Sequence, residues 1–252
     1  MLGEGHRRML TLNNIGKTYP NGLAALDTVD LTIAEGSFTS IVGPSGCGKS
    51  TLLRMIAGLD EPTSGSIVGR PNEIGLVFQD ATLMPWADVE ANVYLPLQLA
   101  GVRRIDAAGR IAEALALVGL SDFTNAYPRA LSGGMRMRVA IARALVTRPR
   151  LLLMDEPFAA LDEITRNRLN DDLLRLWREQ GFTTIFITHS VFESVYLSTD
   201  IAVMTPRPGR VMAVHKVAGP PVRDADFRAT PAYLEGCRAV SHDLVQALAV
   251  AP

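Results

Sequence analysis

Short runs of consecutive apolar residues mark the predicted strands of this 252-residue sequence. The runs occupy residues 38–42, 74–78, 151–154, 184–188 and 201–204. They do not alternate strictly between apolar and polar positions, as expected of strands that are covered on both faces. Helices are predicted between them at residues 50–57 and 163–179, the second with apolar positions at helical spacing. Alternating strands and helices predict an α/β domain with a mainly parallel sheet.

Two regions depart from this alternation. Residues 9–12 and 29–33 alternate apolar and polar positions, which predicts strands of a separate antiparallel sheet. Residues from about 86 to 146 contain no convincing strand, whereas 105–118 and 133–145 have helical patterns. We therefore predict a helical insertion within an α/β core.

The tail beyond Gly219 opens with two prolines and closes with a predicted helix at residues 231–250. The whole chain, residues 1–252, is predicted to be a single domain. Its parts are a nucleotide-binding core at 1–84 and 148–219, a helical part at 85–147 and a helical tail at 220–252.

Composition restricts the environment of the chain. The net charge of −1 gives no strong field toward nucleic acid or an anionic membrane surface. Two cysteines, Cys47 and Cys237, do not form a disulfide framework, which favours a reducing compartment. No apolar run approaches the ~18 residues of a membrane helix, and the first residues contain no apolar core of signal-peptide length, so we expect a cytoplasmic protein.

A glycine-rich loop follows the first buried strand and fits the phosphate-loop pattern G-x-x-x-x-G-K-[ST]. Its residues are Gly43, Pro44, Ser45, Gly46, Cys47, Gly48, Lys49 and Ser50. Glycines let backbone N–H groups approach phosphate oxygens, and the next helix adds its positive end. Lys49 would neutralise the β- and γ-phosphates, and the Ser50 hydroxyl would bind Mg²⁺. A chance match in a turn is the alternative, which the flanking strand and helix make improbable.

Two acids, Asp155 and Glu156, end the apolar run at residues 151–154. Ligands bind at the carboxyl ends of parallel strands. Asp155 would therefore hold Mg²⁺ directly or through water, and Glu156 would polarise the attacking water. A solvated acidic turn is the alternative.

A second glycine-rich segment, Leu131-Ser132-Gly133-Gly134-Met135, precedes the predicted helix at residues 133–145. Ser132 can cap this helix, and the two glycines expose backbone N–H groups. The chain would then have two helix N-termini that bind phosphate. The alternative is that this segment is an ordinary capped helix start, which would have the same sequence pattern. The Asn-Lys-x-Asp signal of guanine specificity is not in the sequence.

In this order, the motifs resemble the ATP-binding subunits of ABC transporters over nearly the whole chain. The resemblance implies that Tyr19 stacks on adenine, that Gly43 through Thr51 bind the phosphates, and that Gln79 senses Mg²⁺ and the γ-phosphate. It implies that Asp155 holds the metal, that Glu156 is the catalytic glutamate, and that His189 is the switch histidine. It also implies that Leu131 through Met135 form the family signature and that residues 160–162, with Asp162, contact a second subunit. The alternatives are a turn aromatic for Tyr19, a solvated strand end for Gln79, a helix cap for Asp162 and a structural histidine for His189.

The resemblance also implies the fold and the partners. The fold is a P-loop NTPase (RecA-like) core with an N-terminal antiparallel β subdomain and an inserted helical subdomain. The expected activity is ATP hydrolysis with ATP and Mg²⁺, coupled to transport by a homodimer at the cytoplasmic face of the inner membrane. Transmembrane permease subunits and, indirectly, an extracytoplasmic solute-binding protein are the expected partners, and nucleic acid is not.

Met135 is a departure, because the family most often has glutamine at this position. The methionine resembles the importer branch for nitrate, sulfonates, taurine and pyrimidine precursors of thiamine. Residues 83–86 and 206–210 resemble that branch too. Leu83, Met84 and Trp86 are expected to form an exposed apolar patch for a membrane partner, or else part of the local core.

Two other functions are compatible with the same fold. A soluble ABC ATPase of translation or DNA repair usually has two cassettes or a long coiled-coil insertion, and this sequence has neither. A regulatory module that binds nucleotide without hydrolysis is disfavoured by Glu156 and His189.

Overall fold

The computed structural model describes residues 7–220, 223–224 and 226–249. The described residues up to Asn72 and from Phe182 onward form one compact unit, and residues 73–181 form a second. The division of the sequence at residues 85, 148 and 220 stays a prediction.

The first unit contains the predicted antiparallel sheet. Its strands, in the order β2-β1-β4, are β2 (Ala24–Ala34), β1 (Arg8–Thr18) and β4 (Ser64–Val68). The strands predicted at 9–12 and 29–33 are confirmed and extend further. β4 was not predicted because most of its residues are exposed, so its sequence carries no apolar signal.

A second sheet of this unit carries the buried strands. In spatial order they are β7 (Thr183–Thr188), β3 (Phe38–Val42), β8 (Asp200–Met204) and β9 (Val211–Lys216). The first three are parallel, and β9 pairs antiparallel with β8. Every residue of β3 and β7 is buried, which confirms the prediction from their continuous apolar runs. β9 was not predicted, since it is largely half-buried or exposed.

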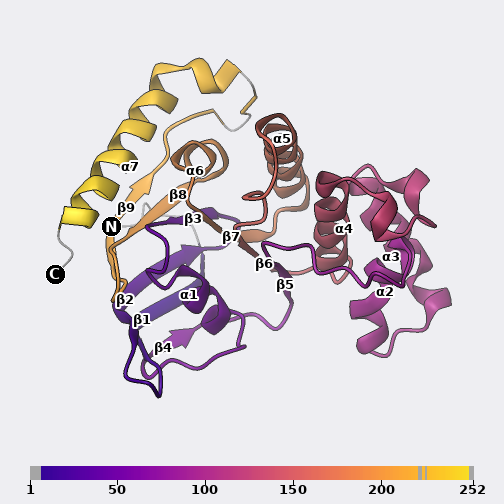
Figure 1. The fold of residues 1–252 in the computed structure, drawn as a ribbon, viewed down its shortest axis with the longest axis horizontal. Helices are drawn as coiled ribbons and strands as arrows, with labels where there is room; N and C mark the ends of the chain where they lie inside the picture. Colours follow the sequence, from indigo (N-terminus) through magenta and orange to yellow (C-terminus); the bar gives the residue numbers. More distant parts are fainter. Residues whose placement is uncertain (1–6, 221–222, 225, 250–252) are drawn as a thin grey trace. The chain divides into compact units, whose positions relative to one another are not determined.

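The helices of the first unit are α1 (Lys49–Ile56), α6 (Val191–Leu197) and α7 (Pro231–Ala249), with a short 3₁₀ helix, η3 (Asp226–Ala229). α6 packs between β3 and α7, and α7 also contacts β8 and β9 (Figure 1). The predicted helix at 231–250 is confirmed as far as Ala249, and residue 250 lies outside the described residues.

The second unit combines two parallel strands with helices. The strands are β5 (Ile74–Val77) and β6 (Leu151–Asp155). The helices are α2 (Val89–Leu99), α3 (Arg104–Leu117), α4 (Gly133–Leu145) and α5 (Glu163–Gln180), with two 3₁₀ turns at Ser121–Phe123 and Pro128–Ala130. α2, α3 and α4 pack on one another (Figure 1). The predicted helical region without strands is confirmed, although α2 was not identified from sequence.

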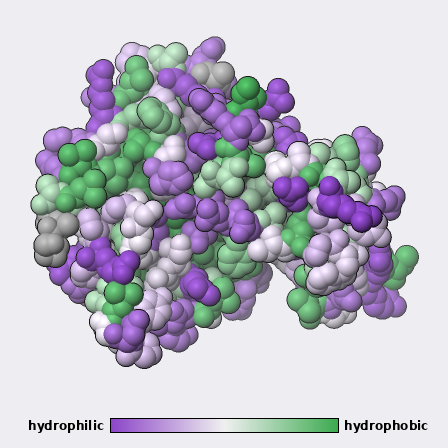
Figure 2. All heavy atoms as spheres, viewed as in Figure 1, coloured by the Kyte–Doolittle hydropathy of each residue, from purple (hydrophilic) through white to green (hydrophobic). Residues whose placement is uncertain are grey.

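The architecture is the predicted α/β fold with a separate antiparallel sheet and a helical region. Apolar and polar residues are interspersed on the face shown in Figure 2. Each helix in the part of the chain that the structure describes is too short or too polar to cross a membrane.

Candidate nucleotide-binding site

The phosphate loop, residues 43–50, links β3 to α1 as predicted. Gly46 and Gly48 have φ values of 74° and 103°, in the left-handed region that favours glycine. A Cβ atom on Gly48 would lie 2.8 Å from the carbonyl oxygen of Ala25. Both the backbone conformation and the closeness of β2 therefore require glycine at this position.

Lys49 is held inside the loop by backbone carbonyls. Lys49 is 4% exposed, and its Nζ atom donates to the carbonyl oxygens of Gly43 at 2.9 Å and Pro44 at 3.0 Å. Carbonyl oxygens carry only partial negative charges, so they do not cancel the positive charge of the Lys49 ammonium. Burial raises the pKa of the nearby Cys47 thiol, which therefore stays neutral. Together with the positive N-terminal end of α1, this charge favours an anion such as a phosphate.

Tyr19 lies beside the end of the phosphate loop. Its Oη atom is 3.1 Å from Oγ1 of Thr51, and the Lys17 ammonium lies 5.3 Å from the centre of its ring. Ser50, in the first turn of α1, is exposed. The structure thus brings the predicted adenine-stacking residue together with the predicted phosphate-binding residues.

A loop at residues 205–210 braces the phosphate loop, a role that the sequence did not reveal. Nε of Arg207 donates to the carbonyl oxygen of Gly46 at 3.0 Å. Gly209 packs so closely that a Cβ atom there would lie 2.0 Å from the carbonyl oxygen of Cys47. Arg210 forms a salt bridge with Asp27. The pKa of the Asp27 carboxyl is lowered first by its hydrogen bond with the Thr28 hydroxyl and second by its bond with Arg210. The distinctive segment Pro-Arg-Pro-Gly-Arg at residues 206–210 was noticed in the sequence. Its contact with the phosphate loop could not be predicted, because the two segments lie far apart along the chain.

His189 follows β7 and is exposed, while its two neighbours, Thr188 and Ser190, are held by hydrogen bonds. The Thr188 hydroxyl donates to Oε2 of Glu193 at 2.5 Å and accepts from the backbone N–H of Ser190 at 3.0 Å. Ser190 in turn caps α6 by accepting from the N–H of Glu193. This arrangement presents the His189 side chain from a short, hydrogen-bonded turn.

Asp155 and Glu156 lie where the sequence predicts, at the carboxyl end of β6. Asp155 is the last residue of the strand, and Glu156 has a φ of 46°. A left-handed conformation is uncommon for glutamate and turns the backbone sharply between the two acids. Gln79 is exposed two residues beyond the end of β5, which stops at Val77 rather than at residue 78.

The signature segment begins α4. Ser132 is exposed, and its Oγ atom accepts from the N–H of Met135 at 3.2 Å, which confirms the predicted cap. A Cβ atom on Gly134 would lie 2.7 Å from Cγ2 of Thr165, so this glycine allows α5 to approach. Asp162 caps α5 by accepting from the N–H of Thr165 at 2.9 Å, and this bond lowers the pKa of its carboxyl. The signature and the predicted dimer-contact loop are therefore neighbours.

The predicted site residues fall into two groups. The phosphate loop, Tyr19 and His189 belong to the first unit, and Gln79, the signature and Asp155 through Asp162 belong to the second. The structure brings residues together within each group.

Comparisons with known proteins agree with these motifs. The family described as ABC transporter matches residues 26–159. A taurine import ATP-binding protein of Rhizobium johnstonii is 46% identical over 220 residues, 84% of this chain and 82% of the relative. An aliphatic sulfonates import ATP-binding protein of Rhodopseudomonas palustris is 46% identical over 219 residues, 80% of this chain and 76% of the relative.

A solved structure has the same fold. It is the dimeric ATP-binding cassette MJ0796 in a post-hydrolysis state, bound to ADP and Pi. The two chains are 36% identical with a TM-score of 0.73, over 84% of this chain and 100% of the cassette.

Proposed function

The chain belongs to the ABC transporter ATP-binding family, and from this membership we propose that it hydrolyses ATP to power a membrane importer. The signature carries the proposal. Exposed Ser132 begins α4 beside Gly133 and Gly134, in a chain whose phosphate loop is already complete around Lys49. Such a helix start can complete the nucleotide site of a second chain.

The chemistry of the site suits ATP. The loop N–H groups and Lys49 would bind the phosphates, and Tyr19 would stack on adenine. Ser50, Gln79 and Asp155 offer hydroxyl, amide and carboxylate oxygens, the donors that Mg²⁺ prefers. When bound, Mg²⁺ would neutralise charge that develops on the phosphates.

Two side chains would act on the attacking water. Glu156 would orient or deprotonate the water, since a carboxylate can act as a general base. His189 would hold the γ-phosphate and the geometry of the water. Lys49 would stabilise the charge of the transition state.

Completion of the site would require a second copy of the chain. Ser132, Gly133 and Gly134 of one copy would meet the γ-phosphate bound to the other, and Asp162 would line the contact. The solved cassette MJ0796 is a dimer, which supports this arrangement. Hydrolysis removes the shared γ-phosphate, so the dimer would loosen after each turnover.

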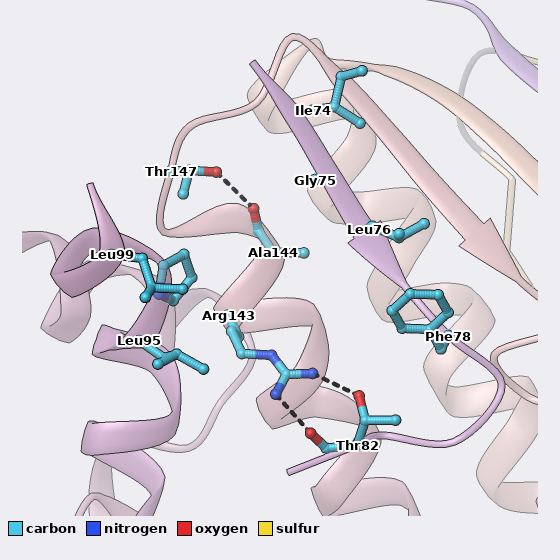
Figure 3. A pocket seen from close by; sticks show the side chains of 11 residues that line it. Ile74, Gly75, Leu76, Phe78, Thr82, Leu95, Leu99, Arg143, Ala144 and Thr147 are labelled. Carbon is cyan, nitrogen blue, oxygen red and sulfur yellow. Dashed lines mark hydrogen bonds between the residues drawn. The ribbon is translucent and has the colours of Figure 1, made fainter. Parts of the chain in front are cut away.

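A groove in the second unit would receive the membrane partner. The groove has a volume of about 470 Å³ and lies beside β5, α2 and α4 (Figure 3). Apolar side chains such as Leu95, Leu99 and Phe78 line it, and Leu99 is 80% exposed. Arg143 donates from its guanidinium to the carbonyl oxygens of Ala81 and Thr82, at 2.8 and 2.9 Å. We assign this groove to a helix of the permease, because that contact would reach the segment just after Gln79.

The apolar patch predicted near this groove is only partly exposed. Trp86 is 76% exposed, whereas Leu83 and Met84 are half-buried. Met84 is also tied to α2 through hydrogen bonds with Asn92. Trp86 is therefore the residue of the three best placed to contact a partner.

The cargo is proposed to be a small anionic or polar solute of the nitrate, sulfonate, taurine or thiamine-pyrimidine type. Relatives named for taurine and aliphatic sulfonates support this class. An extracytoplasmic solute-binding protein would deliver the cargo, and the chain would work at the cytoplasmic face of the membrane.

Reconstitution tests the proposal. The chain would be combined in vesicles with its permease and solute-binding partners, and ATPase activity measured with nitrate, an alkyl sulfonate, taurine and a thiamine pyrimidine precursor. We expect one class to stimulate hydrolysis and to accumulate inside the vesicles. Hydrolysis without stimulation, together with co-purification with ribosomes or DNA, would favour the soluble alternative.

A further inference from the structure

The helix that directly follows His189 is too short to be stable alone. α6 has seven residues, and isolated helices of this length do not persist in water. Val195, Tyr196 and Leu197 are at most 1% exposed, so packing holds the helix in place. Much of that packing comes from the C-terminal segment, residues 223–224 and 226–249, which the matched family region 26–159 does not reach.

Arg223 fastens the carboxyl end of α6. Its Nη1 atom donates to the carbonyl oxygens of Val195 at 3.2 Å, Tyr196 at 2.9 Å and Ser198 at 2.8 Å. The last carbonyls of a helix have no partner within the helix, and a cation is favourable there. One guanidinium thus binds the end of the helix to the tail.

Aromatic rings fasten its side. Phe227 packs against Tyr196 and Tyr233, with ring centres 6.3 and 5.5 Å away. The Arg228 guanidinium lies over the Tyr196 ring, 3.6 Å from its centre. These contacts join α6, η3 and α7 into one cluster.

Tyr233 fastens the amino end. Its hydroxyl donates to the carbonyl oxygen of Phe192 at 3.1 Å, in the first turn of α6. A Cβ atom on Gly236 would lie 3.0 Å from Val195, so this glycine lets α7 approach closely.

Hydrogen bonds connect α6 to both neighbours of His189. Thr188 and Ser190, on either side of His189, are both hydrogen-bonded to Glu193 of α6. A shift of α6 would therefore be transmitted to the His189 backbone through two short connections.

We propose that the C-terminal segment is a positioning clamp for His189, with Arg223 and Tyr233 as its positioning residues. The proposal rests on the role of His189 in the proposed function. The clamp holds α6 from both ends and so fixes the direction of the imidazole toward the γ-phosphate.

Kinetics of the full-length chain test the clamp. In Arg223→Ala we expect kcat to fall about tenfold, while KM for ATP and the affinity for ADP stay within twofold, because ADP has no γ-phosphate for His189 to hold. Arg223→Lys should recover part of the loss, since it restores a donor. The matched control is Asp243→Ala, which removes the 2.8 Å contact between α7 and His215 of β9 without touching α6. It should leave kcat unchanged.

A double-mutant cycle distinguishes the clamp from a general structural role. In a His189→Ala background, Arg223→Ala should cause no further loss of kcat. Additive losses, or equal losses in Asp243→Ala, would overturn the clamp. Normal turnover of His189→Ala alone would instead overturn the assigned role of the histidine.

If Arg223→Ala does not fold, as judged by circular dichroism, Tyr233→Phe takes its place in the same cycle. It removes only a hydroxyl, and we expect a two- to threefold loss of kcat that vanishes in the His189→Ala background. An unchanged kcat in Tyr233→Phe would contradict the clamp.

Discussion

The two glycine-rich helix starts of this chain are built in opposite ways. In the phosphate loop, Lys49 is buried, Gly48 packs against β2, and Gly209 packs against Cys47. At the signature, Ser132 is exposed, and its hydroxyl caps its own helix. In one glycine-rich turn the functional lysine is thus buried and held by neighbouring segments, and in the other the functional serine is exposed.

This difference separates what a single chain can do from what it cannot. A braced loop can bind nucleotide phosphates alone, because its donors are held in place before the ligand arrives. The exposed Ser132 would gain contacts with a nucleotide when a second chain covers it. We therefore expect binding to depend on the first region and hydrolysis to depend on both.

The largest expected effect comes from the chemistry that the two regions share. Glu156→Gln removes the base but keeps the size of the side chain, so kcat should fall by about 10²- to 10⁴-fold. ATP should still bind and should hold the dimer together, because the γ-phosphate is no longer removed. Steady-state ATPase assays and light scattering with and without ATP would measure both. Turnover near that of the unmodified chain would remove Glu156 from its assigned role.

A large substitution at the signature should separate hydrolysis from binding. Ser132→Arg places a bulky side chain where the second copy is expected, and we predict a loss of ATPase of about 100-fold with the Kd for ATP of the monomer changed less than twofold. Weakened binding in the monomer would contradict the comparison.

Mixing two inactive chains sharpens the same point. Lys49→Ala should be inactive because its phosphate loop is impaired. An equal mixture with Ser132→Arg should regain activity, since the mixed dimer holds one intact pair of a phosphate loop and a signature. A mixture as inactive as its components would mean that each chain completes its own site.

The contact between Gly209 and the phosphate loop should have a moderate effect on ATP binding. Gly209→Ala forces a methyl group toward the Cys47 carbonyl oxygen, and overpacking of this kind destabilises by about 1–3 kcal/mol. Part of that strain should displace the loop, so we expect the Kd for ATP to rise roughly tenfold, which corresponds to about 1.4 kcal/mol. Titration with a fluorescent ATP analogue measures it, and an unchanged Kd would show that the brace is dispensable.

The smallest effect is the control for that experiment. Gly109 lies within α3, and a Cβ atom there would meet nothing within 4 Å. Gly109→Ala should therefore stabilise the chain by about 0.5–1 kcal/mol through helix propensity and leave nucleotide binding unchanged. A thermal melt would detect the shift, and a loss of stability would show that α3 is more tightly packed than these contacts indicate.

Sequence predicted those parts of the fold whose signal is local. Buried strands such as β3 and β7 were predicted within one residue, because continuous apolar runs mark them. β4 and β9 were missed because their exposed residues carry no such pattern, and α6 because seven residues contain too little periodicity. α2 contains Pro96, which obscures a helical pattern.

The candidate site divides in the same way. The helix caps at Ser132 and Asp162 followed from short motifs, since a cap involves residues only three apart. The contacts of Gly209 with Cys47, and of Gly134 with Thr165, join distant segments and could not be read from either segment alone. The roles assigned to the site residues remain predictions for the experiments above.

The backbone of Glu156 has a consequence for protein engineering. A φ of 46° disfavours glutamate but suits glycine and, to a lesser degree, asparagine, so either replacement should relieve about 1 kcal/mol of strain. The more heat-resistant protein would then be the one without the carboxylate. A laboratory selection for thermostability or yield would enrich inactive chains at this position, so any screen of this protein should assay turnover alongside stability.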